Sequence, residues 1–175
     1  TCPDSLAGQY HLFIITDFNN RLVETNESDN SLGDDTEIEF LPPDLIVTLV
    51  SAPDSVDAGQ PVSISWTVSN DGLGATKVTS WYDGVYLSPD QILDQTDYNI
   101  GYLQHSGVLM ADSTYTANLS PQIPPGLSGP YYVMVKTDKN NNVYEPGNED
   151  NNHSRTQDAI QIILPDPANL IVTSI

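Results

Sequence analysis

Basic residues, cysteine and long apolar runs are scarce in this sequence. Only five of its 175 residues are Lys or Arg, against 24 Asp and Glu, which gives a formal net charge of −19. A surface of this sign repels nucleic acid and anionic membranes, because both require a basic patch. Cys2 is the only cysteine, so no intrachain disulfide can form. No apolar run approaches the ~18 residues of a membrane span, and no basic segment followed by an apolar one marks a signal peptide.

Sequence signals of enzymatic chemistry are equally sparse. His11, His105 and His153 are scattered, and none pairs with another at a spacing typical of zinc ligands. There is no G-x-S-x-G nucleophile motif, and Cys2 has no evident His partner. An acid pair for glycoside hydrolysis stays open, with nothing in the sequence that singles one out. We therefore expect no enzymatic activity.

Apolar and polar residues alternate strictly in several short segments. In Pro61 to Asn70 the alternation places Trp66 on an apolar face, and in Val78 to Ser88 it places Trp81 on one, so we expect both tryptophans in a core. Tyr82 and Tyr86 face the other way. Further strands are expected near residues 9–16, 36–41, 44–52, 98–103, 114–119, 131–135 and 157–164. With turn residues every ten or so positions, the pattern predicts an all-β, immunoglobulin-like antiparallel β-sandwich of about seven strands.

One polar segment occurs twice. Residues 16–30 read TDFNNRLVETNESDN and residues 137–152 read TDKNNNVYEPGNEDNN, and Leu45 to Thr48 recurs as Leu170 to Thr173. The period, roughly 120 residues, is the size of one sandwich domain, so we expect a tandem array. The predicted organisation is the C-terminal hairpin of a preceding repeat in residues 1–43, a complete sandwich in residues 44–165, and the first strand of a following repeat in residues 166–175.

Three motifs carry a family resemblance. The segments DLIVT (44–48), WYDGVYLSPDQILDQTDYNIG (81–101) and YYVMVKTDKNNNVYEPGNEDNN (131–152) together resemble the cell-adhesion-related domain of bacteria, CARDB. The resemblance implies an immunoglobulin-like sandwich of large secreted or cell-surface prokaryotic proteins, usually in tandem. An extracellular location is therefore expected.

The turn of residues 137–152 carries many oxygen ligands. Side chains and one carbonyl fall at positions 1, 3, 5, 7 and 12 of an EF-hand-like spacing, which suits Ca²⁺: Asp138, Asn140, Asn142, Tyr144 and Glu149. Glu145 lies between them. Val143 replaces the glycine of such a loop and no helices flank it, so this is not an EF-hand. The alternative is a turn whose Asn and Asp side chains bond to their own backbone.

The first copy narrows the candidate Ca²⁺ ligands. Arg21 replaces Asn142 and cannot ligate, whereas Asp17, Asn19, Glu24 and Glu27 persist. A site common to both copies would use the Asp, the first Asn and the two Glu. Because this set lies between one strand and the next, we expect it to hold the last hairpin close to the linker and to set the angle between domains.

A second group of acids is a weaker metal candidate, with solvated loop residues as the alternative: Asp83, Asp90, Asp94 and Asp97. The leading functional hypothesis is a non-enzymatic tandem module for adhesion or spacing, stiffened by Ca²⁺, whose partners are neighbouring repeats and a cell-surface protein or polysaccharide. The alternative is an accessory carbohydrate-binding module of a secreted hydrolase that stacks sugars on Tyr82, Tyr86 or Tyr102.

Overall fold

The computed structural model describes residues 8–166 and 171–172, without the side chains of residues 35–38. This part of the chain contains eleven strands and no helix, so no helix in it is long and apolar enough to cross a membrane. The strands are β1 (Gly8–Ile15), β2 (Ser31–Phe40), β3 (Leu45–Ser51), β4 (Ser55–Asp57), β5 (Ile64–Asn70), β6 (Ser80–Ser88), β7 (Tyr98–Ser106), β8 (Thr114–Leu119), β9 (Gly129–Lys136), β10 (His153–Arg155) and β11 (Ile160–Ile163).

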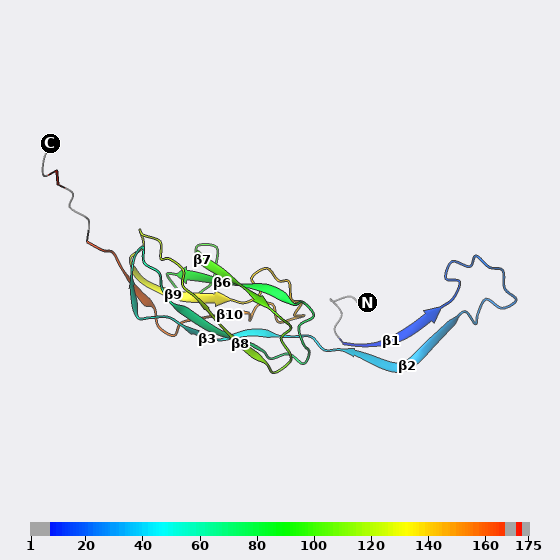
Figure 1. Cartoon of the computed structure of the whole chain (residues 1–175). Coiled ribbons are helices and arrows are strands. Elements are labelled where there is room, and N and C mark those ends of the chain that lie inside the picture. Colours follow the sequence, from blue (N-terminus) through cyan, green and yellow to red (C-terminus); the bar gives the residue numbers. More distant parts are fainter. Residues whose placement is uncertain (1–7, 167–170, 173–175) are drawn as a thin grey trace.

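Strands β3 to β11 form a sandwich of two sheets (Figure 1). The larger sheet has the order β4-β11-β9-β6-β7, with β10 also paired to β9, and the smaller has the order β3-β5-β8. All pairs are antiparallel except β4 with β11, which are parallel. The predicted all-β sandwich is thereby confirmed. Nine strands make up the sandwich, and seven of them are longer than three residues.

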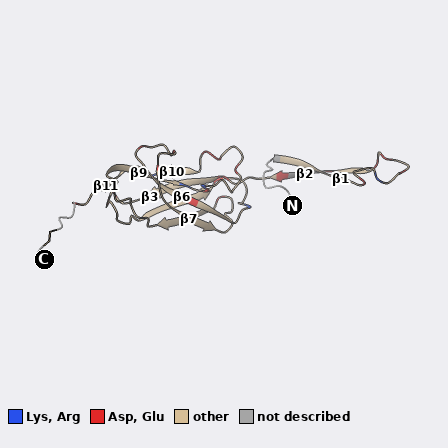
Figure 2. Cartoon of the chain, turned by 90° about the horizontal axis from the view of Figure 1, so that it is seen from above, with Lys and Arg blue, Asp and Glu red and all other residues tan. Residues whose placement is uncertain are grey.

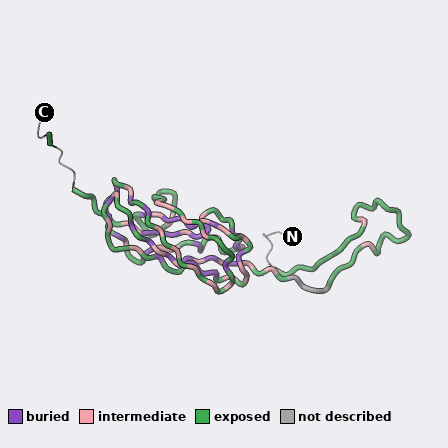
Figure 3. Tube along the Cα trace, in the orientation of Figure 1, coloured by how far each residue is buried: buried purple, intermediate pink, exposed green. Residues whose placement is uncertain are grey.

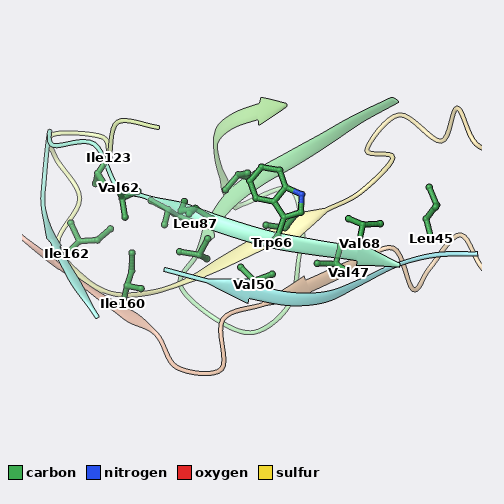
Figure 4. Close-up of a cluster of buried hydrophobic side chains, with 14 of the residues drawn as sticks. Leu45, Val47, Val50, Val62, Trp66, Val68, Leu87, Ile123, Ile160 and Ile162 are labelled. Atoms are coloured by element: carbon green, nitrogen blue, oxygen red, sulfur yellow. The ribbon is translucent and has the colours of Figure 1, made fainter. Parts of the chain in front are cut away.

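The core lies between the two sheets, where the inward residues of alternating strands meet (Figure 4). Trp66 and Trp81 are both fully buried, as the period-two pattern predicts. Ile64 and Val68 on β5 and Val85 and Leu87 on β6 contribute the same alternation. Burying side chains of this size contributes about 1.5–3 kcal/mol each. The sandwich is therefore stabilised by packing the apolar face of one sheet against the apolar face of the other.

The hairpin of β1 and β2 lies beyond one end of the sandwich and is joined to it by residues 41–44 (Figure 1). Its described side chains are almost all exposed, in contrast to the sandwich (Figure 3). Leu12, Phe13 and Ile14 are exposed by 49%, 67% and 62%. A hairpin this apolar and this exposed lacks the second layer that would bury it.

The predicted strands agree with the structure in most segments and differ at a few. β4 and β10 have three residues each, too few for a period to be read, and the sequence did not predict them. β2 begins at Ser31, earlier than expected. The strand predicted in residues 166–175 lies largely outside the described residues, and the described positions 166 and 171–172 are not in a strand.

Candidate functional site

The acidic turn between β9 and β10 is organised by Asp138. Its two carboxylate oxygens accept hydrogen bonds from the backbone N–H groups of Asn142 at 2.9 Å and Val143 at 2.8 Å. Asp138 and Asn141 have positive φ angles of 42° and 52°, a conformation that Asp and Asn adopt more readily than most residues. Asp138 is fully buried, and this burial raises its pKa although the two N–H donors oppose the rise. Its carboxylate thus shapes the backbone of the turn.

Glu145, at the centre of the turn, contacts the first strand of the sandwich. One carboxylate oxygen accepts a hydrogen bond from the backbone N–H of Leu45, and the other accepts one from the Asn152 side-chain amide. All three residues are fully buried. Burial is the main cause that raises the pKa of Glu145 from 4.5 to about 7; the two hydrogen bonds oppose the rise, and the charges of Glu149 and Asp138 add to it. The turn is therefore attached to the start of the domain through a buried carboxyl group.

The linker from the hairpin is also held by the end of β5 and the loop that follows it. Asn70 is fully buried, and its side-chain oxygen accepts a hydrogen bond from the backbone N–H of Asp44 at 3.0 Å. The N–H of Gly74 donates to the carbonyl of Pro42, also at 3.0 Å. A Cβ on Gly74 would lie 1.9 Å from the carbonyl oxygen of Leu41, so only glycine permits this approach.

The two attachments meet at Asp44 and Leu45. Asn70 binds the N–H of Asp44 from one side, while the Asn151 side-chain amide donates to Asp44 Oδ1 at 2.9 Å and Glu145 binds the N–H of Leu45 from the other. Pro42 and Pro43 restrict the backbone just before this point. The linker consequently leaves the sandwich in a fixed direction.

The β1–β2 hairpin repeats the pairing of the last strands of the sandwich. Ile15 pairs with Ser31 as Lys136 pairs with His153. Further along, Tyr10 pairs with Ile38 as Tyr131 pairs with Ile160. Because register decides which side chains share a face, the two hairpins present equivalent faces.

The turn of the first hairpin also repeats the second. Asp17 has a φ of 39° and accepts hydrogen bonds from the N–H groups of Arg21 at 2.9 Å and Leu22 at 2.7 Å, the same pattern that Asp138 makes in its own turn. The N–H of Glu24 donates to Glu27 at 3.0 Å, the bond that Glu145 makes to Glu149 at 2.9 Å. The two turns thus share their backbone geometry as well as their sequence.

What the first copy lacks is the contact with a sandwich. Val143 is 1% exposed in the core, whereas its counterpart Leu22 is 65% exposed. Asn152 donates to Glu145, whereas the side-chain nitrogen of its counterpart Asn30 is buried without a hydrogen-bond partner. Glu24, the counterpart of Glu145, is exposed. The first turn is therefore formed but has no domain to attach to in the described chain.

The predicted metal ligands are only partly brought together. Asn140, Asn142 and Tyr144 are exposed, as are Asn19 and Glu27 in the first copy, whereas Asp138 and Glu145 use their oxygens on N–H donors. Within residues 8–166 and 171–172, no group of three or more His, Cys, Asp or Glu side chains is placed to hold a metal ion. Two buried oxygens in the second turn remain without a partner, Oε2 of Glu149 and Oδ1 of Asn152.

Asp83 does not join Asp90, Asp94 and Asp97, contrary to their grouping from the sequence. Those three lie in the β6–β7 connection and bond to local N–H groups, and the bonds from Thr96 lower the pKa of Asp94. Asp83 is buried in the core because it shares the inward face of β6 with the apolar residues of that strand.

The Asp83 carboxylate is the centre of a buried hydrogen-bond network. It accepts from Trp66 Nε1 at 2.7 Å, from the Tyr115 hydroxyl at 2.8 Å and from the Thr137 hydroxyl at 2.8 Å. Burial raises the pKa of Asp83, and these bonds oppose the rise. His105 stacks on Tyr115 with ring centroids 4.0 Å apart. Both carboxylate oxygens of Asp83 therefore accept hydrogen bonds within the core.

Sequence reasoning missed several residues of the junction. Asn70 and Leu45 act through partners that lie 26 and 100 positions away along the chain, and nothing local marks them. Asn152 bonds to Glu145 within the same turn, where the sequence offers many similar Asn residues. The glycines at 72 and 74 offered a signal, since two glycines in one short loop indicate a close backbone approach.

Comparison with known proteins agrees with the architecture. The family model CARDB matches residues 42–156. The solution structure of the CARDB domain of the PF1109 protein from Pyrococcus furiosus aligns with a TM-score of 0.51 at 20% identity, covering 72% of this chain and 100% of that one. A crystal structure of the same domain in complex with di-metal ions aligns with a TM-score of 0.49 at 19% identity, over 69% and 89% of the two chains.

A β-glucosidase from Listeria innocua in complex with glucose aligns with a TM-score of 0.43 at 13% identity, covering 73% of this chain and 17% of that one. No curated protein matches the chain at a significant level. The family match spans well over half of the sequence, and its limits enclose both the junction residues and most of the sandwich core. The chain belongs to the CARDB family.

Proposed function

We propose that the protein is a non-enzymatic, extracellular spacer built of tandem CARDB sandwiches, in which each sandwich holds the linker from the one before. The observation that carries the proposal is the recurrence of one hairpin geometry, once inside the sandwich and once outside it. Tyr10, Leu12 and Ile14 occupy in β1 the places of the inward residues of β9. The hairpin thus has the form of the last strands of a preceding repeat.

The junction suits a spacer because its bonds fix a direction. Asp44 and Leu45 are bound by Asn70, Asn151 and Glu145, and each such bond contributes about 1 kcal/mol. A linker held on two sides by buried groups cannot rotate freely, so domain spacing is kept. Such an array in a prokaryotic surface protein would place an adhesive partner, a surface protein or a polysaccharide, at a set distance.

A hybrid chain tests the array. Residues 44–128 joined directly to residues 8–166 give the first hairpin the six strands, β3 to β8, that precede β9 in the sandwich. Two folded sandwiches are expected, with the amides of β1 and β2 protected from hydrogen exchange and Leu22 buried. Glu24→Ala in the hybrid should weaken the first sandwich by about 1–3 kcal/mol, while the same change in the 175-residue chain should have no effect. A hairpin that stays unprotected in the hybrid would contradict the proposal.

We also propose that the turn of residues 137–152 takes up Ca²⁺ weakly. Support comes from the two buried oxygens without a partner, on Glu149 and Asn152, and from the mutual repulsion of Glu145, Glu149 and Asp138. A cation there would relieve that repulsion. Extracellular modules bind Ca²⁺ with Kd values of roughly 10⁻⁴ to 10⁻³ M.

The test is a thermal melt in chelator and in about 10 mM Ca²⁺, a concentration above that range. The melting temperature should rise with Ca²⁺, and Glu149→Gln should remove the rise. Glu27→Gln, the matched change in the first copy, should preserve it. Equal melting temperatures in chelator and in Ca²⁺ would end this part of the proposal and leave the array proposal intact.

A second candidate function, an accessory carbohydrate-binding module, is favoured by one observation. Tyr82, Tyr86 and Tyr102 share the outer face of the larger sheet, and Tyr102 is 61% exposed. Tyrosine offers an apolar ring with a polar tip, which suits a sugar. Retardation of the protein in gels that contain polysaccharide tests this function, and free migration in every such gel would contradict it.

A further inference from the structure

The outer face of the larger sheet gathers most of the positive charge of this acidic chain. Lys136, Lys139 and Arg155 lie there, three of the five Lys and Arg residues in the sequence. Lys and Arg positions, blue in Figure 2, are few along the described ribbon. Among the described residues none of the three forms an ion pair, although the chain has 24 acids. The charge of Lys136 acts on Asp138, but that carboxylate is buried and bonded to N–H groups of its own turn. Unpaired cations on one face of such a chain indicate a place for an anion.

The pairing of the strands places three tyrosines on the same face as these cations. Gly84 at the centre of β6 lies opposite Tyr102 on β7 and opposite Lys136 on β9. Directly opposite residues share a face, so all three positions are on the outside. Tyr86 lies across Gly84, where a Cβ would meet its hydroxyl oxygen at 2.7 Å. Tyr82 meets Tyr102 edge-on, with ring centroids 5.6 Å apart.

Contacts within the face hold its cations in place. Lys139 Nζ lies 5.8 Å from the centroid of the Tyr102 ring, and the Lys139 backbone N–H donates to the Tyr82 carbonyl at 2.8 Å. At the far end, the Arg155 guanidinium lies 4.7 Å from the Tyr132 ring. The positions of Lys139 and Arg155 are therefore set before any ligand arrives, which lowers the entropy that binding costs.

We infer that this face, the Tyr82–Gly84–Lys136 face, binds an acidic polysaccharide, that is, a chain of sugar rings that carry carboxylate or sulfate groups. Tyr102, Tyr82 and Tyr86 provide ring surfaces and hydroxyl groups for the sugars, and Lys136 and Lys139 provide charge-assisted hydrogen bonds for the anionic groups. Protein interfaces are depleted in lysine, so a protein partner fits this face less well.

The inference narrows the second candidate function to one class of glycan and is independent of the array. The 175-residue chain is titrated with polygalacturonate, and with dextran as the neutral control, in about 0.15 M salt, where charges beyond ~8 Å are screened. Polygalacturonate should bind and dextran should not. Lys136→Gln with Lys139→Gln should weaken binding about tenfold. Arg21→Gln with Lys77→Gln, which lowers the net charge equally, should change it by less than about twofold.

Three outcomes would overturn the inference of an acidic polysaccharide. Binding of dextran as tight as that of polygalacturonate, weakened by Tyr102→Ala and not by the Lys136/Lys139 variant, overturns the acidic class and keeps the carbohydrate-binding candidate. No binding to either polymer overturns both. Self-association in analytical ultracentrifugation that the Lys136/Lys139 variant abolishes overturns the inference in favour of a second copy. Unchanged near-ultraviolet circular dichroism confirms that each variant is folded.

Discussion

Replacement of Glu145 by Gln should remove a pH dependence from the stability of the sandwich. The pKa of Glu145 is raised in the folded state to about 7 from 4.5, mainly because the carboxyl is buried. Below pH 4.5 the group is protonated in both the folded and the unfolded chain, and its full contribution is present. Between pH 4.5 and 7 only the folded chain keeps the proton, so the free energy of unfolding falls as pH rises.

The size of this effect follows from the shift. One pKa unit corresponds to about 1.4 kcal/mol, so the whole shift amounts to about 3 kcal/mol between pH 4.5 and pH 8. The glutamine side chain of the variant has no charge in either state. Its amide oxygen can accept the Leu45 N–H, and its NH₂ group can donate to Asn152 once the Asn152 amide turns over. The free energy of unfolding of the variant should therefore increase relative to that of the wild type as pH rises.

Urea unfolding followed by the fluorescence of the two buried tryptophans measures the difference. The free energy of unfolding of Glu145→Gln minus that of the wild type should be about 3 kcal/mol more favourable at pH 8 than at pH 4.5. Glu145→Ala also lacks the titrating carboxyl, so it should show the same change of about 3 kcal/mol relative to the wild type. Because it leaves the Leu45 N–H without an acceptor, it should be about 1–3 kcal/mol less stable than Glu145→Gln at both pH values. A Gln difference that is equal at the two pH values would refute the reasoning, because the carboxyl would then titrate alike in both states.

Three further predictions concern the core and the junction. Asp83→Asn should destabilise the sandwich by about 2–4 kcal/mol, since an amide NH₂ would face hydroxyl or indole donors; urea unfolding at pH 7 measures it, and a neutral result would mean that the network is dispensable. Gly74→Ala should cost about 1–3 kcal/mol and expose the Asp44 amide to hydrogen exchange, whereas Gly126→Ala, with open space at its Cβ, should do neither. Tyr115→Phe should cost about 0.5–1.5 kcal/mol, because Asp83 loses one of its three donors; an unchanged midpoint in urea would show that another group replaces it.

The sequence predicted the sandwich well wherever a period of two was long enough to be seen. β8 has the bounds expected, and the inward faces of β5 and β6 hold the expected tryptophans. β4 and β10 escaped because three residues define no period. Asp83 was expected on the Trp81 face of its strand, yet its carboxylate was grouped with the acids of the next loop as a weaker metal candidate.

The importance of the turn of residues 137–152 could be predicted from the sequence, but its contact with β3 could not. The recurrence of its residues in the first copy marked it, and the alternative of Asp and Asn bonded to their own backbone describes what Asp138 and Asp17 do. The partner of Glu145 is the backbone of Leu45, 100 positions earlier in the chain. A backbone N–H has no sequence signature, so this bond became visible only with the fold.

Every contact described above that fixes the linker of residues 41–44 and the first residue of β3 comes from the sandwich that follows the linker, through Asn70, Gly74, Asn151 and Glu145. In an array of such repeats, each unit carries the whole joint to its upstream neighbour. Duplication or loss of one unit would then add or remove a complete joint and leave the others unchanged. The length of the protein could vary in whole steps during evolution without any matched substitution in the units on either side.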